Sequence, residues 1–282
     1  MTAGPRPRIV DLSVAVDPAH WEPDPVRRRV VDHRHGADLL GQAYAHLRSR
    51  NRLDRWAKLL RHRMGGGVTH RDFPDGKGLS LMHYTLTTHT GTHMDAPYHY
   101  GDRTTAGAPA RTICQVPLEW CLGDGVLLDV TAGPADQPVT RAEVEAALVA
   151  AGYQLKPFDI VLLRTAGDRE IGQPGYFQRF RGVTREATAF LVEQGIRVIG
   201  VDSFGFDPPF LRMLDDYGRT GDQAHLWPAH LFGRDQEYCQ LERLTNLDTI
   251  GQAHGFQVSC LPVKLTGADA GWCRVVAIMP PA

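Results

Sequence analysis

Four side chains that can bind a metal ion stand close together in one short segment of the sequence. His89, His93, Asp95 and His99 lie within eleven residues of one another. Neutral imidazole nitrogens and a carboxylate oxygen are ligands that zinc and similar divalent ions take in proteins. Their density predicts a metal site in preference to separate polar residues on a solvated loop.

The spacing of these residues also constrains the path of the backbone. All four positions are odd, so a straight strand would place them on one face. At about 3.3 Å per residue, however, such a strand would hold His89 and Asp95 roughly 20 Å apart, and bonds of about 2.0–2.2 Å to one ion cannot close that gap. We therefore expect a turn at Gly91, with Pro97 stiffening the exit, or a helical turn that joins positions 89 and 93.

Patterns of strand and helix alternate along the chain. Thr140 with Glu143 forms a capping box at the start of one helix, and Thr184 begins another that Gly195 ends. The alternation predicts an α/β fold class, with a mixed β-sheet core packed by helices in a single domain, residues 1–282. Apolar runs predict strands at 9–16, 84–88, 126–130, 160–163, 196–201, 256–261 and 274–279.

An arginine-rich stretch at about 20–67 differs from the rest of the chain, and we interpret it as a helical insertion. Its apolar residues recur at helical spacing and predict two amphipathic helices, the second broken at 64–67. Each apolar stripe must be covered, either by the chain's own core or by a neighbouring subunit. The residues of the stripes are Leu39, Leu40, Ala43, Tyr44, Leu47, Leu53, Trp56, Leu59 and Leu60.

The overall composition excludes several classes of partner. Lysine and arginine number 31 against 32 aspartates and glutamates, so the chain as a whole has no field that attracts nucleic acid or an anionic membrane. No apolar run approaches the ~20 residues of a membrane span, and no secretory leader is recognisable. Five cysteines without a C-x-x-C pair indicate reduced thiols. We expect a cytoplasmic protein that acts on a small molecule.

The residues of the histidine segment also match a known signature. Residues 89–99, HTGTHMDAPYH, resemble the H-x-G-T-H-x-D-x-P-x-H motif of the cyclase-like metal hydrolases, which include kynurenine formamidase and isatin hydrolase. The resemblance implies that family's mixed-sheet fold and a homo-oligomer, a dimer or tetramer. Further stretches similar to the family's motifs are IVDLS at 9–13, GVDSFGFDP at 200–208, ERLTNLD at 242–248, LPVK at 261–264 and RVVAI at 274–278.

The resemblance assigns roles to particular residues. It implies that His89, His93 and Asp95 bind a divalent metal, with Asp95 bridging where two ions bind. Zinc is the ion we expect, with manganese as the alternative. In zinc-containing members a distal histidine and glutamate complete the site. Glu242 matches that glutamate, and His230 matches the histidine, with His225 as its rival.

His99 matches the family's general acid/base, a role that suits a side chain able to exchange a proton near neutral pH. We therefore predict a metal-dependent hydrolase that cleaves an amide, lactam or lactone of a small aromatic molecule with metal-activated water. A metal-dependent cyclase or dehydratase of small-molecule biosynthesis is the alternative. A metal-binding protein without turnover is a third reading, which the complete set of residues disfavours.

Two departures from the family pattern fall where substrate choice would be set. Gly205 stands where the family has a serine, and residues 164–167, RTAG, replace its usual T-G-W. The second change leaves the aromatic wall of the pocket without its usual residue. We also consider Asp202 and Asp207 as carboxylates that orient the metal-binding histidines, or alternatively as residues that form turns at the end of the strand.

Overall fold

A computed structural model describes residues 6–135 and 137–281. Contacts along the chain divide the protein into two compact units. Unit 1 comprises Met1–Asp24 and Thr87–Ala282, and unit 2 comprises Pro25–Leu86. Unit 2 contains both helices of the predicted insertion, but it begins later and ends later than the 20–67 expected from the sequence.

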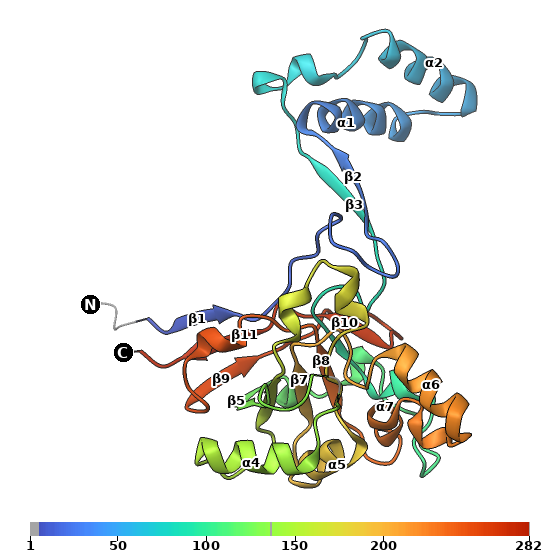
Figure 1. The fold of residues 1–282 in the computed structure, drawn as a ribbon. Helices are drawn as coiled ribbons and strands as arrows, with labels where there is room; N and C mark the ends of the chain where they lie inside the picture. Colours follow the sequence, from blue (N-terminus) through green and yellow to red (C-terminus); the bar gives the residue numbers. More distant parts are fainter. Residues whose placement is uncertain (1–5, 136, 282) are drawn as a thin grey trace. The chain divides into compact units, whose positions relative to one another are not determined.

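Unit 1 is built on a nine-stranded sheet with the order β1-β11-β9-β5-β6-β7-β8-β4-β10 (Figure 1). Strands β5, β6, β7 and β8 run parallel to one another, and the flanking strands pair antiparallel. The sheet is therefore mixed, as predicted. The strands are β1 Arg8–Asp11, β4 His93–Asp95, β5 Leu122–Asp129, β6 Ile160–Arg164, β7 Val198–Val201, β8 Cys239–Glu242, β9 Phe256–Ser259, β10 Ala270–Trp272 and β11 Val276–Met279.

The central strands are covered on both faces. Ile160 and Leu162 of β6 belong to one hydrophobic cluster, and Val161 and Leu163 belong to another, and all four are fully buried. Burial on both faces is typical of parallel strands and explains their nearly continuous apolar runs. Helices α4 and α5 pack against the second cluster on one side of the sheet (Figure 1). The helices of unit 1 are α3 Pro97–Tyr100, α4 Arg141–Ala151, α5 Arg185–Glu193, α6 Phe210–Thr220 and α7 Pro228–Phe232.

The predicted helix starts are present, whereas several strand limits differ. Thr140 and Glu143 form the expected capping box at α4, and the Thr184 side chain caps α5. The strand expected at 9–16 ends at Asp11. The strand expected at 84–88, leading into the histidine segment, is instead β3 Leu81–Thr85 of unit 2. The sequence patterns did not predict β4 or β8, because these strands are only three and four residues long. They also left out α6, although its apolar residues recur at helical spacing.

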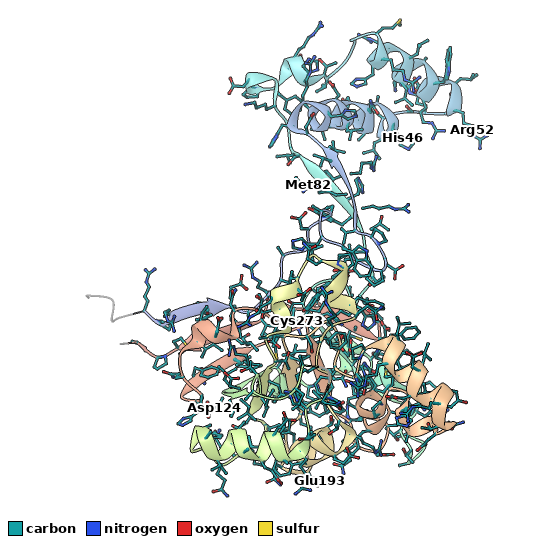
Figure 2. The ribbon with its side chains drawn as sticks, in the orientation of Figure 1. His46, Arg52, Met82, Asp124, Glu193 and Cys273 are labelled. Atoms are coloured by element: carbon teal, nitrogen blue, oxygen red, sulfur yellow. The ribbon has the colours of Figure 1, made fainter. Side chains whose placement is uncertain are left out.

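Unit 2 consists of a two-stranded ladder and two helices. Strands β2 Arg27–Val31 and β3 Leu81–Thr85 pair antiparallel over five residues. Helix α1, His33–Leu47, follows β2 directly, and α2, Arg52–Arg63, follows α1. The carboxylate of Asp32 and the side-chain oxygen of Asn51 cap their first turns. Figure 2 shows His46 and Arg52 near the connection between the two helices. Within the described ranges, no helix of either unit is both long and apolar enough to cross a bilayer.

Candidate active site

Strand β4 places two of the predicted residues beside a third from a distant part of the sequence. His93 lies opposite Glu242 of β8, and Asp95 lies opposite Gln240. Residues two apart on a strand share a face, so His93, Asp95 and Glu242 converge on one side of the sheet. The Nε2 of His93 is 3.3 Å from Asp95 Oδ1 and 3.5 Å from Glu242 Oε2.

A turn before β4 returns His89 to the same place. Gly91 has a φ of 66°, a left-handed conformation that glycine adopts without steric cost. The Nδ1 of His89 consequently lies 3.2 Å from His93 Nε2 and 3.0 Å from Asp95 Oδ1. The structure thus contains the turn at Gly91 that the distances required, and not a helical turn from 89 to 93.

Helix α3 carries His99 back over the group. Pro97 occupies the first position of this short helix, where its missing N–H costs nothing. The ring of His99 lies 4.4 Å from that of His89 and 5.3 Å from that of His230, between centroids. His93 and Asp95 are buried, whereas His99 is exposed. His99 therefore lies on the side of the group that a substrate in solvent can reach.

His230 enters the group from α7, and Asp207 fixes its orientation. The Asp207 carboxylate accepts hydrogen bonds from the backbone N–H groups of Ala229, at 2.7 Å, and His230, at 3.1 Å, and it also contacts His230 Nδ1. The other ring nitrogen, Nε2, then lies 3.6 Å from Asp95 Oδ2. His225, the alternative considered from the sequence, lies in a separate turn at Gln223–His225, outside these clustered side chains.

Of the two aspartates considered as orienting groups, only Asp207 touches a histidine of the group. The Asp202 carboxylate instead accepts hydrogen bonds from the backbone of Thr165 and Ala166, at 2.8 and 2.9 Å, and from the Thr165 hydroxyl. Asp202 therefore stabilises the turn at 164–167, which is the turn-forming role that was its alternative, and it does not orient a histidine of the group. Burial raises its pKa to about 6 against the lowering effect of these hydrogen bonds.

The donor set at Asp95 fits a divalent cation. Both oxygens of Asp95 are buried and accept no hydrogen bond of acceptable geometry, although three imidazoles surround them. Burying a carboxylate without hydrogen bonds costs desolvation free energy. A bound cation would compensate the negative charge in their place. Ligand atoms about 2.1 Å from a tetrahedral ion are roughly 3.4 Å apart, close to the distances here. His89, His93 and Asp95 form one candidate group within 4.8 Å, and Asp95, His99 and His230 form another.

The electrostatics of the group favour positive charge. Burial by itself would lower the pKa of His89, but Asp95 and Asp269 raise it to about 9. For His230, burial is again opposed, chiefly by Asp207, and the pKa rises to about 10. Burial would raise the pKa of Asp95, yet His99 and the neighbouring imidazoles hold it well below its usual range. The carboxylates thus stabilise positive charge in this group. That charge can be carried by protonated imidazoles or by a metal ion that displaces their protons.

One residue of the site, Asp269, was not predicted from the sequence. Its Oδ2 lies 3.0 Å from His89 Nε2 and 3.4 Å from His99 Nδ1, and its Oδ1 accepts a hydrogen bond from Thr88. Together these imidazoles and the threonine hydroxyl lower the pKa of Asp269 against the opposing effect of burial. The only signal in the sequence is a lone acid after Gly267 and Ala268, and the pairing of β10 with β4 is what brings it to the histidines.

A cavity of about 200 Å³ opens beside the group. His99, His230 and Glu242 form its polar wall, and aromatic rings form most of the rest. These rings come from other segments than residues 164–167, so an aromatic wall exists despite the altered T-G-W stretch. The remaining lining residues are Phe177, Phe180, Phe204, Gly205, Phe206, Asp207, Pro208, Phe210, Met213 and Trp227.

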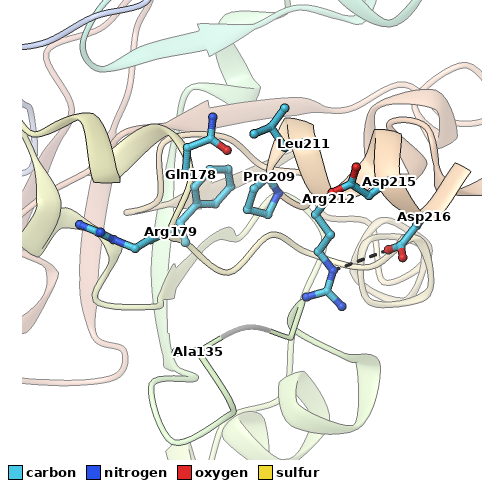
Figure 3. A pocket seen from close by; sticks show the side chains of 9 residues that line it. Ala135, Gln178, Arg179, Pro209, Leu211, Arg212, Asp215 and Asp216 are labelled. Carbon is cyan, nitrogen blue, oxygen red and sulfur yellow. Dashed lines mark ion pairs between the residues drawn. The ribbon is translucent and has the colours of Figure 1, made fainter. Parts of the chain in front are cut away.

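Gly205 leaves room in this cavity. A Cβ at this position would lie 3.5 Å from the Phe180 ring and 3.9 Å from Glu242 Oε1, which are ordinary contacts. A Cβ would therefore fit at this position, and its absence widens the cavity beside Glu242. A larger hollow of about 690 Å³ lies elsewhere on unit 1 and shares only Phe180 with this cavity (Figure 3). The larger hollow contains none of the clustered histidines, so the smaller cavity is the candidate substrate pocket.

Comparison with known families agrees with this architecture. Residues 10–208 match the model of a family described as putative cyclase. The match covers most of the chain and includes the histidine segment. The protein therefore belongs to the putative cyclase family, and the membership expected from the sequence motifs is confirmed.

Solved structures share the fold over nearly the whole chain. An isatin hydrolase bound to the product analogue thioisatinate is 18% identical, with a TM-score of 0.69 over 98% of this chain and 93% of its own. Isatin hydrolase A from Labrenzia aggregata, bound to benzyl benzoate, is 21% identical, with a TM-score of 0.67 over 97% and 94%. A potential metal-dependent hydrolase with cyclase activity is 18% identical, with a TM-score of 0.59 over 98% and 100%. At these identities the comparison establishes the fold.

Proposed function

We propose that the protein is a metal-dependent hydrolase that cleaves an amide, lactam or lactone bond of a small aromatic molecule. The observation that carries the proposal is the buried Asp95 carboxylate, which lacks hydrogen bonds and is surrounded by imidazoles beside an aromatic cavity. The names of the structural neighbours, isatin hydrolase and metal-dependent hydrolase, point to the same class of reaction.

His89, His93 and Asp95 would hold one divalent ion, and Asp95, His230 and Glu242 would hold a second where two bind. Imidazole nitrogens with carboxylate oxygens suit zinc best and accept manganese. Such an ion supplies Lewis acidity, which polarises a carbonyl and lowers the pKa of water.

His99 would move the proton of the reaction. Its ring lies at the cavity wall and contacts Asp269 through Nδ1, at 3.4 Å. Asp269 would thereby hold the ring so that Nε2 faces the substrate, as a carboxylate orients a catalytic histidine in other hydrolases. In this arrangement His99 takes a proton from the attacking water and returns it to the leaving nitrogen or oxygen.

The cavity favours a flat, apolar substrate. Phe204, Phe180 and Trp227 offer ring faces and edges, which bind aromatic groups in offset or edge-on contacts. Its volume of about 200 Å³ is below the ~300–1,000 Å³ of ordinary ligand pockets, so it suits only a small substrate. Gly205 provides no hydroxyl, so recognition beside Glu242 would depend on shape.

A cyclase or dehydratase is the alternative, supported by the family's description and by a structural neighbour with cyclase activity in its name. The same ion and His99 can promote attack by a nucleophile within the substrate in place of water. Turnover in ¹⁸O-labelled water separates the two, because only hydrolysis places the label in the new carboxylate.

The experiment that tests the proposal combines metal analysis with a substrate screen. Protein purified without chelator should contain one or two divalent ions per chain, and it should release acid from isatin, N-formylkynurenine or simple aryl lactones. Chelation should abolish turnover, and zinc or manganese should restore it. Turnover that survives complete removal of metal would overturn the proposal, as would protein that neither holds nor takes up a divalent ion.

A further inference from the structure

One wall of unit 1 separates the candidate substrate pocket from a second hollow. The pocket has a volume of about 200 Å³, and the hollow has a volume of about 690 Å³ (Figure 3). Pro208 and Phe210 line the pocket. Pro209 and Leu211, which alternate with them along the same segment, line the hollow. Phe180 lines both, so its side chain forms part of the partition between the two spaces.

The residues that follow Phe180 fix the backbone at this point of the wall. Arg181 is buried, and its guanidinium donates a hydrogen bond to the Glu143 carboxylate, at 2.7 Å, and others to backbone oxygens. A Cβ at Gly182 would lie 2.2 Å from the backbone carbon of Asp207, so the two segments pack directly against each other. Phe180 itself is only 8% exposed. A buried ring on a fixed backbone is a permanent part of the wall.

Phe180 also limits the depth of the pocket opposite Glu242. A Cβ added at Gly205 would lie 3.5 Å from Phe180 Cζ and 3.9 Å from Glu242 Oε1. These two distances sum to 7.4 Å, so Phe180 Cζ and Glu242 Oε1 cannot be further apart than that. Atoms in van der Waals contact are about 3.5–4.0 Å apart. The space between the two side chains therefore takes the thickness of one flat ring and no more.

We propose that Phe180 determines substrate specificity by closing the pocket toward the hollow. The pocket then accepts flat aromatic substrates and excludes those that carry a bulky group out of the ring plane. This inference rests on the proposed function, because it concerns the substrate of that same site. His99, His230 and Glu242 lie in the polar wall and determine where the substrate reacts, whereas Phe180 determines which substrates fit.

The hollow beyond Phe180 has room for the group that the pocket excludes. Pro209 and Leu211 give it an apolar side, and its charged residues include Arg212 and Asp216, which lie 3.7 Å apart as an ion pair. Truncation of Phe180 to alanine would therefore connect the pocket to space that already exists, in place of leaving a closed cavity. A substrate with a second ring should gain from this change, whereas a flat substrate should not.

Two lactones that differ by one ring test the proposal. They are the aryl lactone coumaranone and its phenyl derivative, whose second ring is attached to the saturated carbon beside the carbonyl and lies out of plane. The wild type should hydrolyse the flat lactone with a kcat/KM roughly 100-fold above that of the derivative. Phe180→Ala should reduce this ratio at least about tenfold, through a gain on the derivative. Phe180→Leu preserves more of the packing and should change the ratio in the same direction but by less.

Phe177→Ala is the matched control, because Phe177 lines the pocket but not the hollow. Loss of this ring should affect both lactones alike and leave their ratio unchanged. A gain on the phenyl derivative in Phe177→Ala equal to that in Phe180→Ala would overturn the proposal, since pocket volume alone would then explain it. An unchanged ratio in both Phe180 variants would overturn it as well, as would a wild type that hydrolyses the two lactones equally well.

Binding measurements make the same comparison without turnover. Calorimetric titration of the purified protein with benzoate and with diphenylacetate should show that the wild type binds only benzoate appreciably, and that Phe180→Ala gains affinity for diphenylacetate. This comparison decides the inference even if the protein hydrolyses neither lactone, so its failure is distinguishable from failure of the proposed reaction. Equal affinity of the wild type for both carboxylates, or no binding of benzoate, would contradict the assigned role of Phe180.

Discussion

The histidine group of unit 1 and the helices of unit 2 distribute polar and apolar side chains in opposite ways. In unit 1, His93 and Asp95 are buried, although burial of charge is costly. In unit 2, Leu47 and Leu53 remain about four-fifths exposed, although their burial would be favourable. Each region departs from the usual pattern in folded proteins, in which apolar side chains are buried and charged side chains are exposed. The comparison teaches that each departure suggests binding from outside the chain: the buried group suits a cation, and exposed apolar side chains are typical of a surface that another molecule covers.

The largest expected effect is at the centre of the buried group. His93→Ala removes a fully buried imidazole that the proposed metal site uses as a ligand. We expect loss of bound metal together with a fall in kcat/KM on the order of 10³-fold or more. Elemental analysis and kinetics measure the two effects. His225→Ala, which alters a histidine outside the group, is the control, and equal losses in both variants would contradict the assigned site.

His99→Ala should separate catalysis from metal binding. Because His99 lies on the exposed side of the group, the other side chains can still hold the ion. We expect kcat to fall about 10²–10⁴-fold with most of the metal retained. If the variant emerges without metal, His99 is a ligand and its role as acid/base is wrong.

Asp269 should have a smaller effect, because it acts through the rings of His99 and His89. We expect Asp269→Ala to lower kcat by about 10–100-fold. Asp269→Asn should lose less, since its amide oxygen can still accept a hydrogen bond from a ring N–H. The pH profile of kcat should shift in the alanine variant, whereas a residue that serves only folding would leave the profile in place.

Metal affinity should depend on pH in a direction set by the histidines. Without a bound ion, the pKa values of His89 and His230 are about 9 and about 10, so both imidazoles are in their positively charged, protonated form at pH 7. A metal ion must displace these protons. Affinity should therefore rise between pH 7 and pH 9, by about tenfold per pH unit for each proton displaced. Calorimetric titration in buffers of different ionisation enthalpy counts the protons, and an affinity that does not vary with pH would contradict this electrostatic account.

The smallest effect on the site is expected from a change confined to unit 2. A Cβ at Gly36 would lie 1.7 Å from the backbone oxygen of Leu79, so Gly36→Ala must displace α1 or the segment before β3. We expect about 1–3 kcal/mol of local destabilisation. Hydrogen exchange should accelerate in 33–47 while β4 stays protected and the metal content stays unchanged. A loss of metal in this variant would show that the two units are coupled.

Much of the site could be predicted from the sequence because its central residues are neighbours in the chain. His89, His93, Asp95 and His99 lie in one segment, and simple distances required the turn that Gly91 makes. Caps of α4 and α5 were equally predictable, since a cap depends on residues three apart. Strand β4 was not, because three residues carry too little periodicity to identify a strand.

The sequence by itself therefore determined the local chemistry: the donors, the turn, the helix caps, and the concentration of positive charge in residues 25–86. The family resemblance implied that the distant Glu242 and His230 join them, but the tertiary structure decided how they do so and added Asp269. The register of β4 with β8 sets Glu242 beside His93, and the pairing of β10 with β4 brings Asp269 to His99. The tertiary structure also places His230 in the group and His225 outside it, a choice that the similar flanking residues had left open. The physical reason is that strand pairing joins residues far apart in sequence, and its register depends on how the whole sheet is packed and not on any local pattern.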